Sequence, residues 1–302
     1  MRNKMKKITV YPNLRTVFLL VIGMSIMLSC AVKSKVSISE KRTVKVSSYN
    51  IRYNAKADIT NGNGWSKRKS EVAKLIQKYQ FEIIGTQEGD FSQMNDLKEL
   101  LPEFNQVSKP YGGKTNDIHT CSILFKSSLF ELLDEGVFWL SQTPDVPSIG
   151  WDATDQRICQ WAKFKSKQTG EVFYFFNAHF YWQKEEARLQ SGSLMVKKIK
   201  EIAGKSPVIC TGDFNSTVET NQIKAIKEQY QDAYDVSKGG RKGVEGTNIA
   251  GGVFTGPSKG RIDYVFVSKN IQVLDYEVYS DVYDGNRYPS DHLPVGVTLM
   301  FE

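Results

Sequence analysis

The sequence predicts a mixed α/β (α+β) fold, in which many short strands alternate with helices. Three observations support this prediction. Residues 44–53 and 81–88 are predicted strands, and an amphipathic helix pattern lies between them. Several later apolar runs are short and rich in aromatic and β-branched residues, as strands are. Polar side chains directly follow many of these runs, and such strand ends are a usual location for an active site.

The charge of the chain is concentrated at its N-terminus. The 302 residues include 40 basic and 33 acidic ones, a net charge of +7, with average apolar content, as expected for a globular protein. The first 29 residues hold five of the basic residues and no acidic one, which leaves 35 basic against 33 acidic residues from there on. This near-neutral balance argues against a strongly basic nucleic-acid footprint.

The first 30 residues resemble an export signal. A basic start precedes the apolar residues 17–28 and then Ser29-Cys30, and the apolar run is short for a membrane span. A cysteine at this boundary resembles a bacterial lipobox, in which Cys30 is lipidated and becomes the mature N-terminus. We therefore expect an exported lipoprotein, anchored to a membrane in the periplasm or at the cell surface. The alternative is an ordinary signal peptide with an incidental cysteine.

The predicted domain organisation follows from this signal. Residues 1–30 are a lipoprotein-type signal peptide, and residues 31–43 are a polar, Lys/Ser-rich tether. Residues 44–302 form the functional domain. Its three cysteines all lie in apolar runs without zinc-site spacing, which predicts buried free thiols; one disulfide with a leftover thiol is the alternative.

The elements of the domain follow from local patterns. Apolar residues recur at i, i+3, i+4 and i+7 from Val72, with Lys and Gln opposite, which predicts a helix from Trp65. Aromatic-rich strands at residues 157–164 and 171–177 flank Gln168-Thr169-Gly170, a hairpin signal. Further strands are predicted at residues 120–125, 130–133, 137–140, 208–210, 261–268, 272–279 and 295–300, and further helices at residues 90–101, 185–202 and 222–230.

The most informative strand end lies at residues 212–215. An apolar strand, Val208-Ile209-Cys210, leads through Gly212 to Asp213 and Asn215. If the backbone stays extended, these two side chains point to the same side. A carboxylate beside an amide suits a hard cation and a phosphate oxygen. The alternative is a strand that ends in a common Asx turn.

Other strands end in the same way, and together these ends predict one polar site. Its carboxylates are oxygen ligands for Mg²⁺, Mn²⁺ or Ca²⁺, and its histidines are suited to acid–base chemistry near neutral pH. Asp263 interrupts an apolar strand and needs a partner, either His292 or a metal. The alternatives are a satisfied core histidine for His179 and turn roles for the asparagines. The predicted site consists of Asn50, Glu88, His179, Asp213, Asn215, Asp263, Asp291 and His292.

Six short motifs follow one another along the chain: Tyr49-Asn50-Ile51, Gln87-Glu88, Asn177-Ala178-His179, Gly212-Asp213-Phe214-Asn215, Arg261-Ile262-Asp263-Tyr264 and Ser290-Asp291-His292. In this order they resemble the endonuclease/exonuclease/phosphatase (DNase I-like) family, over about residues 44–301. Residues 136–161 are similar to its secreted bacterial branch. The resemblance implies a four-layer α/β/β/α sandwich of two packed mixed β-sheets with flanking helices.

The resemblance also implies the metal site. Glu88 is the expected main ligand of a divalent cation, Mg²⁺ or else Mn²⁺ or Ca²⁺, with Asn50 and Asp291 near the ion. Arg157 resembles the family's phosphate-contacting arginine, and its alternative is a solvated surface arginine.

Further roles come from the same resemblance. Asp213 and Asn215 are expected to orient the attacking water and the scissile phosphate. Asp263 is expected to hold His292 and raise its basicity, as in a catalytic triad. His179 is expected to contact the phosphate or to assist the leaving group.

One position departs from the family pattern. Many members carry Glu where His119 stands, and that Glu pairs with the histidine that matches His179. Two imidazoles cannot reproduce a carboxylate–imidazole pair, which puts a general-acid role of His179 in doubt. Either the metal activates the leaving oxygen, or His119 contacts the substrate, or it is an exposed loop histidine.

We therefore predict a divalent-metal-dependent hydrolase of phosphoester bonds, of the phosphodiesterase or nuclease type, in which water attacks in line. Its alternative is a phosphomonoesterase acting on a sugar, inositol or lipid head-group phosphate, and a surface binding lipoprotein is the non-enzymatic alternative. The expected partners are the phosphoester substrate (nucleic acid or a small-molecule or lipid phosphate) and a membrane, and no protein partner is predicted. The aromatic loops near Trp139, Trp151 and Tyr181-Trp182 form either a ligand pocket or core, and core is favoured for Trp139.

Overall fold

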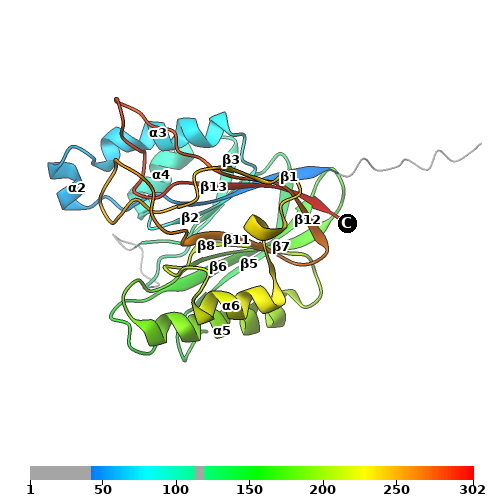
Figure 1. The fold of residues 1–302 in the computed structure, drawn as a ribbon. Helices are drawn as coiled ribbons and strands as arrows, with labels where there is room; N and C mark the ends of the chain where they lie inside the picture. The colour runs from blue at the N-terminus through cyan, green and yellow to red at the C-terminus, as the bar shows by residue number, and fades with distance from the viewer. Residues whose placement is uncertain (1–41, 113–118) are drawn as a thin grey trace, which may run out of the picture. The chain divides into compact units, whose positions relative to one another are not determined.

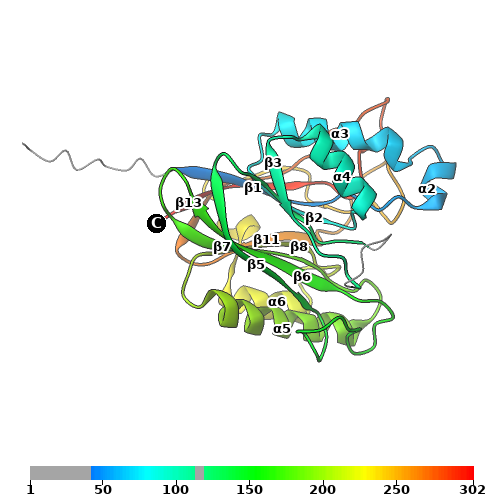
Figure 2. The same cartoon turned by 180° about the vertical axis from the view of Figure 1, so that it is seen from behind.

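Two β-sheets pack face to face in the computed structural model, and helices cover their outer faces, so the elements form four layers (Figures 1 and 2). The structure describes residues 42–112 and 119–302. Both sheets mix parallel and antiparallel strands, which confirms the predicted α/β/β/α sandwich. The predicted signal peptide, with Cys30, and nearly all of the predicted tether lie outside the described residues.

The first sheet has seven strands, and β1 pairs with β2 in parallel and with β13 in antiparallel. Its spatial order is β10 (Arg241–Gly243), β12 (Ile271–Val278), β13 (Val295–Phe301), β1 (Thr43–Asn50), β2 (Ile83–Gln87), β4 (Ile123–Lys126) and β3 (Phe104–Val107).

The second sheet has six strands, and its β7–β8 pair is parallel. Its spatial order is β5 (Phe130–Trp139), β6 (Ile158–Ser166), β7 (Val172–His179), β8 (Val208–Asp213), β11 (Asp263–Val267) and β9 (Gln231–Asp232).

Helices α3, α4, α5 and α6 cover the outer faces because each turns an apolar stripe towards a sheet. Val72 and Ile76 of α3 pack with Tyr49 of β1 and Ile84 of β2, whereas α5 and α6 pack on the second sheet. No helix of the described residues is long and apolar enough to span a membrane. The helices are α2 (Lys56–Thr60), α3 (Trp65–Lys78), α4 (Phe91–Leu100), α5 (Glu185–Ala203), α6 (Asn221–Gln229) and α7 (Ala233–Val236).

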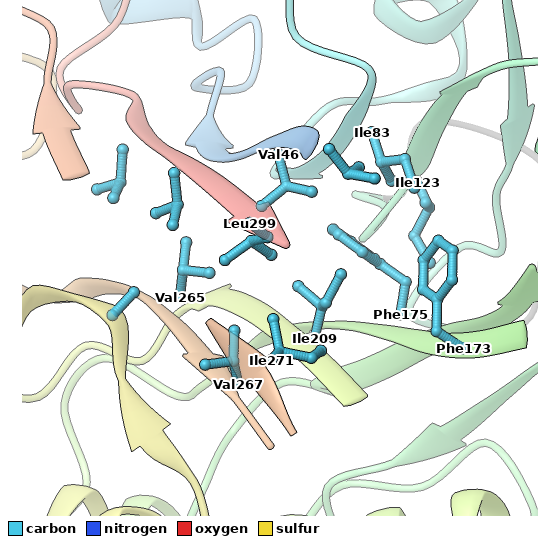
Figure 3. Packing of buried hydrophobic residues seen from close by; sticks show 14 of the residues in the cluster. Val46, Ile83, Ile123, Phe173, Phe175, Ile209, Val265, Val267, Ile271 and Leu299 are labelled. Atoms are coloured by element: carbon cyan, nitrogen blue, oxygen red, sulfur yellow. The ribbon is translucent and has the colours of Figure 1, made fainter. Parts of the chain in front are cut away.

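The main apolar core lies between the two sheets (Figure 3). Alternate residues of β1, such as Val46, face Ile209 and Val265 of the second sheet across this layer, as the two-residue period of a strand requires. Strand β8 is buried along its whole length because α5 and α6 cover its other face. This double burial explains why residues 208–210 form a continuous apolar run.

Most predicted strands and helices are present, but one prediction is wrong. The structure joins the separate strands predicted at 130–133 and 137–140 into one, β5, which pairs with β6 across a register shift between Leu132 and Asp134. Glu135 stays paired with β6 although it is exposed. Backbone pairing therefore continues where the apolar pattern stops.

The two sheets lie close together near the site, at Gly85 of β2 and Asn177 of β7. Asn177 Nδ2 donates to the backbone oxygens of Thr86 (2.8 Å) and Ser122 (3.0 Å), and its Oδ1 accepts from Gln87 Nε2 (2.7 Å). A buried amide with these partners connects the two sheets by hydrogen bonds. Only a residue without a side chain fits at position 85, because a Cβ there would overlap the Asn177 and Thr211 side chains.

We expect Gly85→Ala to lower the free energy of unfolding by about 1–3 kcal/mol through overpacking. Thermal denaturation would measure the change. Gly260→Ala is the matched control, because its added Cβ meets Thr217 at 3.4 Å, an ordinary contact. Equal melting temperatures for the two variants would contradict the prediction.

Candidate active site

Parallel pairing places the ends of four strands at one rim of the sandwich. In each sheet one parallel pair, β1–β2 and β7–β8, ends at this rim. The polar residues at these ends are Asn50, Glu88, His179 and Asp213. Two segments add the remaining predicted residues: Asp263 opens β11 directly opposite Asp213, while residues 291 and 292 lie just before β13.

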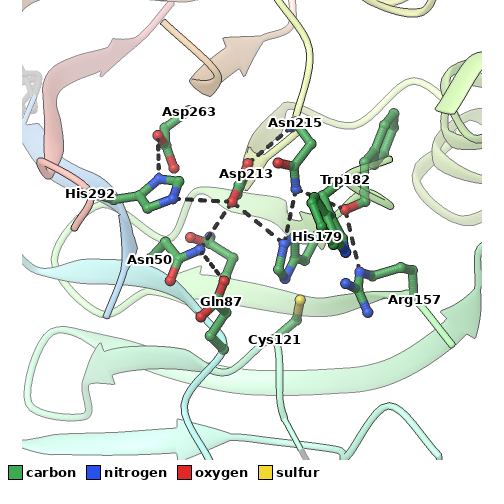
Figure 4. Close-up of polar contacts among 12 residues, drawn as sticks. Asn50, Gln87, Cys121, Arg157, His179, Trp182, Asp213, Asn215, Asp263 and His292 are labelled. Carbon is green, nitrogen blue, oxygen red and sulfur yellow. Dashed lines mark hydrogen bonds and ion pairs between the residues drawn. The ribbon is translucent and has the colours of Figure 1, made fainter. Parts of the chain in front are cut away.

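A pocket of about 810 Å³ opens at this rim. Six of the eight predicted site residues line it, and Arg157 lines it too, as predicted for a phosphate contact. Asn50 and Asp263 do not line the pocket; they are fully buried and hydrogen-bonded to lining residues (Figure 4). The structure therefore brings all of these residues together around one pocket.

Asp213 and Asn215 adopt the turn that was the alternative prediction. The Asn215 backbone N donates to Asp213 Oδ1 (2.9 Å), which is an Asx turn, and Asn215 has a φ of 46° rather than an extended backbone. Both side chains nevertheless line the pocket. Glu88 also has a positive φ, 69°, and backbone strain of this kind is common at functional sites.

Asn50 holds two carboxylates in place. Its Nδ2 donates to Glu88 Oε1 (3.1 Å) and Asp213 Oδ2 (3.0 Å), while its Oδ1 accepts from the Arg52 backbone N (3.0 Å). Glu88 Oε2 accepts from the Tyr53 backbone N (3.2 Å). In this arrangement the amide nitrogen of Asn50, and not its oxygen, faces the carboxylates. A metal contact by Asn50 stays a prediction.

Arg52 is a site residue that the sequence reasoning missed. Its Nη1 lies 4.0 Å from Glu88 Oε2 and 3.7 Å from Asp291 Oδ2, and its Nε donates to Asp58 Oδ2 (2.9 Å). Asp291 also accepts from the Gly252 backbone N (2.7 Å). One guanidinium thus fixes two of the predicted metal-site carboxylates. The position of Arg52 two residues after Asn50 was the only feature of the sequence that pointed to this role.

Tyr111 was also missed, and it takes the place expected for an acidic partner of His179. The Tyr111 hydroxyl and His179 Nδ1 are hydrogen-bonded (2.7 Å), and Asn215 Nδ2 donates to His179 Nε2 (3.1 Å). This network assigns the proton of a neutral imidazole to Nδ1. His119 lines the pocket and its ring lies 4.6 Å from that of Tyr53, centroid to centroid.

His292 lies between two carboxylates. Its Nδ1 bonds Asp263 Oδ2 (2.9 Å), and its Nε2 lies 3.7 Å from Asp213 Oδ2. Asp263 Oδ2 also accepts from Thr247 Oγ1 (2.6 Å). The Asp263–His292 pair therefore has the geometry predicted for it, with the free imidazole nitrogen directed towards Asp213 and the pocket.

The charges of the site follow from burial and these neighbours. Burial lowers the pKa of His179 well below its usual value, which keeps that imidazole neutral. Burial also favours the neutral form of His292. The negative charges of Asp263 and Asp213 have the larger effect, however, and raise the His292 pKa well above its usual value. Burial raises the pKa of Asp213 to about 7, although His292 opposes this. Burial also disfavours ionised Glu88, yet the neighbouring imidazole and guanidinium groups and the Asn50 hydrogen bond lower its pKa to about 2.

The donor set fits a divalent cation. Ligand atoms of Glu88, His179 and Asp213 lie within 4.8 Å of one another, and all three side chains line the pocket. Carboxylate oxygens are the ligands that hard divalent cations prefer. A second such group joins Asp213 to Asp263 and His292, which are already paired with each other. Among the described residues, Asp291 belongs to neither group.

Arg157 is held by aromatic rings rather than by carboxylates. Its guanidinium lies 5.5 Å from the Tyr111 ring and 5.3 Å from the Tyr181 ring, and it donates to the backbone oxygens of Gln156 (3.0 Å) and Phe180 (3.4 Å). A cation over the face of an aromatic ring is attracted by the electrons of the ring. This half-buried residue is therefore a preoriented cation at the pocket and not a freely solvated arginine.

The four-layer sandwich and the acidic, imidazole-containing site at its rim define a metal-dependent hydrolase of phosphoesters. The chain belongs to the endonuclease/exonuclease/phosphatase family, whose model matches residues 47–292. Enzymes of this family are divalent-metal-dependent phosphoester hydrolases, and so is this protein. The family membership supports the enzymatic prediction over the binding-lipoprotein alternative.

Three relatives illustrate the range of the family. A solved mannosyl-6-phosphatase from Bacteroides thetaiotaomicron is 36% identical, with a TM-score of 0.81 over 85% of this chain and 100% of that one. Uncharacterized protein L388 of Acanthamoeba polyphaga mimivirus is 29% identical over 79% of this chain and 92% of its own length. The CCR4-Not complex 3'-5'-exoribonuclease subunit Ccr4 of Aspergillus clavatus is 27% identical over 53% of this chain, which spans only 28% of that protein.

Proposed function

We propose that the enzyme is a phosphomonoesterase that removes phosphate from a sugar phosphate. The charge of its pocket carries this proposal. In the part of the pocket that the structure describes, the arginines at positions 52 and 157 are the only Lys or Arg side chains, and Arg52 is paired with carboxylates. A nucleic-acid groove needs several cations along a backbone, whereas one phosphate needs few.

The relatives support the same substrate class. The mannosyl-6-phosphatase matches nearly the whole domain at 36% identity, whereas the match to the exoribonuclease covers about half of this chain. Phosphodiester cleavage, the first function predicted from the sequence, remains the competing proposal. The two differ in the size and charge of the group that must fit beyond the phosphate.

The residues of the pocket have distinct proposed roles in hydrolysis. Asp213, with a pKa of about 7, is placed to take the proton of the attacking water near neutral pH. Protonated His292 and Arg157 donate to the phosphoryl oxygens and stabilise their charge. Asn215 and His179 line the pocket beside these groups and are hydrogen-bonded to each other, and the leaving sugar oxygen takes its proton from solvent water.

We propose Mg²⁺ or Mn²⁺ as the cation, with Glu88 as its main ligand. When bound, the cation offsets negative charge on the phosphoryl group. Glu88 is suited to this role because its pKa of about 2 keeps it ionised throughout the neutral range.

A substrate comparison tests the proposed function. We expect the chain from residue 31 on to release phosphate from mannose 6-phosphate with Mg²⁺ or Mn²⁺, and release to stop in EDTA. The same protein is tested on bis(p-nitrophenyl) phosphate and a single-stranded oligonucleotide. Hydrolysis of the diesters without release from any sugar phosphate would contradict the proposal and favour the phosphodiesterase.

We also propose that the protein is an exported lipoprotein, with Cys30 as the lipidated residue, because the leader of residues 1–30 has the required pattern. We expect the full-length protein, expressed in a bacterium, to incorporate labelled palmitate and to sediment with membranes. Cys30→Ala should abolish the label and release the protein from membranes. A labelled Cys30→Ala variant would disprove this site.

A further inference from the structure

An exposed tryptophan lines the catalytic pocket. Trp182 is 55% exposed, whereas Trp65 and Trp139 are only 4% and 7% exposed, so the latter two belong to the packed interior. Burial of such a large ring is favourable, so an indole left exposed at the edge of a pocket can gain contact area from a bound ligand. Trp182 contributes little to the core, and nothing in the hydrolytic chemistry requires an indole.

The backbone of Trp182 is fixed relative to the catalytic residues. Arg188 Nη1 donates both to the Trp182 carbonyl oxygen (3.0 Å) and to the Asn215 carbonyl oxygen (3.2 Å). The preceding Tyr181 is buried, and its hydroxyl bonds Thr154 Oγ1 (2.7 Å). Figure 4 shows Trp182 on the side of the site where Asn215 and Arg157 lie. The indole is therefore attached beside the phosphate-binding side chains rather than on a loose loop.

A carboxylate lines the same pocket. Asp155 is exposed, lies two residues before Arg157, and accepts from Thr154 Oγ1 (3.0 Å) through Oδ2. Its Oδ1 has no hydrogen-bond partner among the described residues. A carboxylate beyond the phosphate repels further phosphates, but it accepts well from hydroxyl groups.

We propose that Trp182 and Asp155 form the sugar-recognition site of the enzyme. The indole packs against the C–H face of a pyranose ring, and Asp155 accepts hydrogen bonds from the ring hydroxyls, while the phosphate lies between Arg157 and Asn215. This inference rests on the proposed sugar-phosphate function and adds the residues that select the sugar.

Steady-state kinetics of Trp182→Ala and Trp182→Phe on mannose 6-phosphate test the proposal. In the alanine variant KM should rise about tenfold and kcat should stay within about threefold, because the indole of Trp182 contacts the sugar rather than the reacting atoms. The phenylalanine variant should restore most of the loss. Glycerol 3-phosphate, which has no ring, is the control substrate and should react equally with all forms. Asp155→Asn should also raise KM for mannose 6-phosphate alone.

An unchanged KM in Trp182→Ala, or an equal loss with glycerol 3-phosphate, would overturn the proposal. If the parent enzyme releases no phosphate from any sugar phosphate, the proposed function fails. A binding measurement then tests by itself whether Trp182 contacts a sugar. Free mannose in EDTA should change the tryptophan fluorescence of the parent but not of Trp182→Phe. If the two titrations do not differ, sugar binding at Trp182 is disproved independently of the proposed function.

Discussion

Replacement of Glu88 by glutamine should lower the metal-dependent rate by roughly 10³-fold or more while the fold stays intact. Glutamine keeps the shape of the side chain and can still accept from the Asn50 amide, but it lacks the negative charge that a divalent cation needs. Rates at increasing Mg²⁺ measure the loss, and Mn²⁺ binding followed by electron paramagnetic resonance measures the weakened site without turnover.

Glu82→Gln is the matched control for this prediction. Glu82 precedes β2 and Glu88 follows it, so the same substitution is made at the two ends of one strand. Glu82 pairs with Arg42 and does not line the pocket. The control should keep full activity and metal affinity. A Glu88→Gln variant within tenfold of the parent would remove Glu88 from the metal site.

The strands were predictable where burial is uneven along the chain. Strand β8 of the second sheet has helices on one face and the first sheet on the other. It therefore appears in the sequence as an apolar run followed by Asp213. Strand β5 was split in two because residues 134–136 are not buried, although they stay paired to β6. Hydrogen bonds to a neighbouring strand do not depend on side-chain type and leave little trace in the sequence.

The site was predictable as a set of strand ends but not as a network. Glu88 and Asp213 both come at the ends of apolar strands, so they were expected in one polar site. Arg52 and Tyr111 were not, because each acts through a partner distant in sequence, Asp291 and His179. Long-range pairs of this kind depend on the assembled sheets.

The aromatic residues show the same limit. Trp139 and Trp182 both occur in aromatic runs near strand ends, yet Trp139 is core, as favoured from the sequence, and donates to the Tyr111 backbone oxygen. Trp182 is exposed at the pocket. Which of the two is covered depends on the neighbouring sheet and loops, which local patterns do not reveal.

His292→Ala should lower the rate by roughly 10³- to 10⁵-fold. The lost imidazole is both the cation at the phosphate and the group that acts with Asp213. The imidazole is 7% exposed and hydrogen-bonded to Asp263, so its removal leaves a cavity beside the pocket. Added imidazole should recover part of the rate. A loss of less than tenfold, with or without imidazole, would exclude a catalytic role of His292.

Asp263→Asn shows whether the carboxylate acts through His292. Without the negative charge of Asp263 the His292 pKa falls, so the protonated form is lost at lower pH and the alkaline limb of the pH–rate profile should move to lower pH. The double variant should be no slower than His292→Ala, because the orienting residue has nothing left to orient. If the two losses add in full and the alkaline limb does not move, Asp263 has a structural role that is independent of His292.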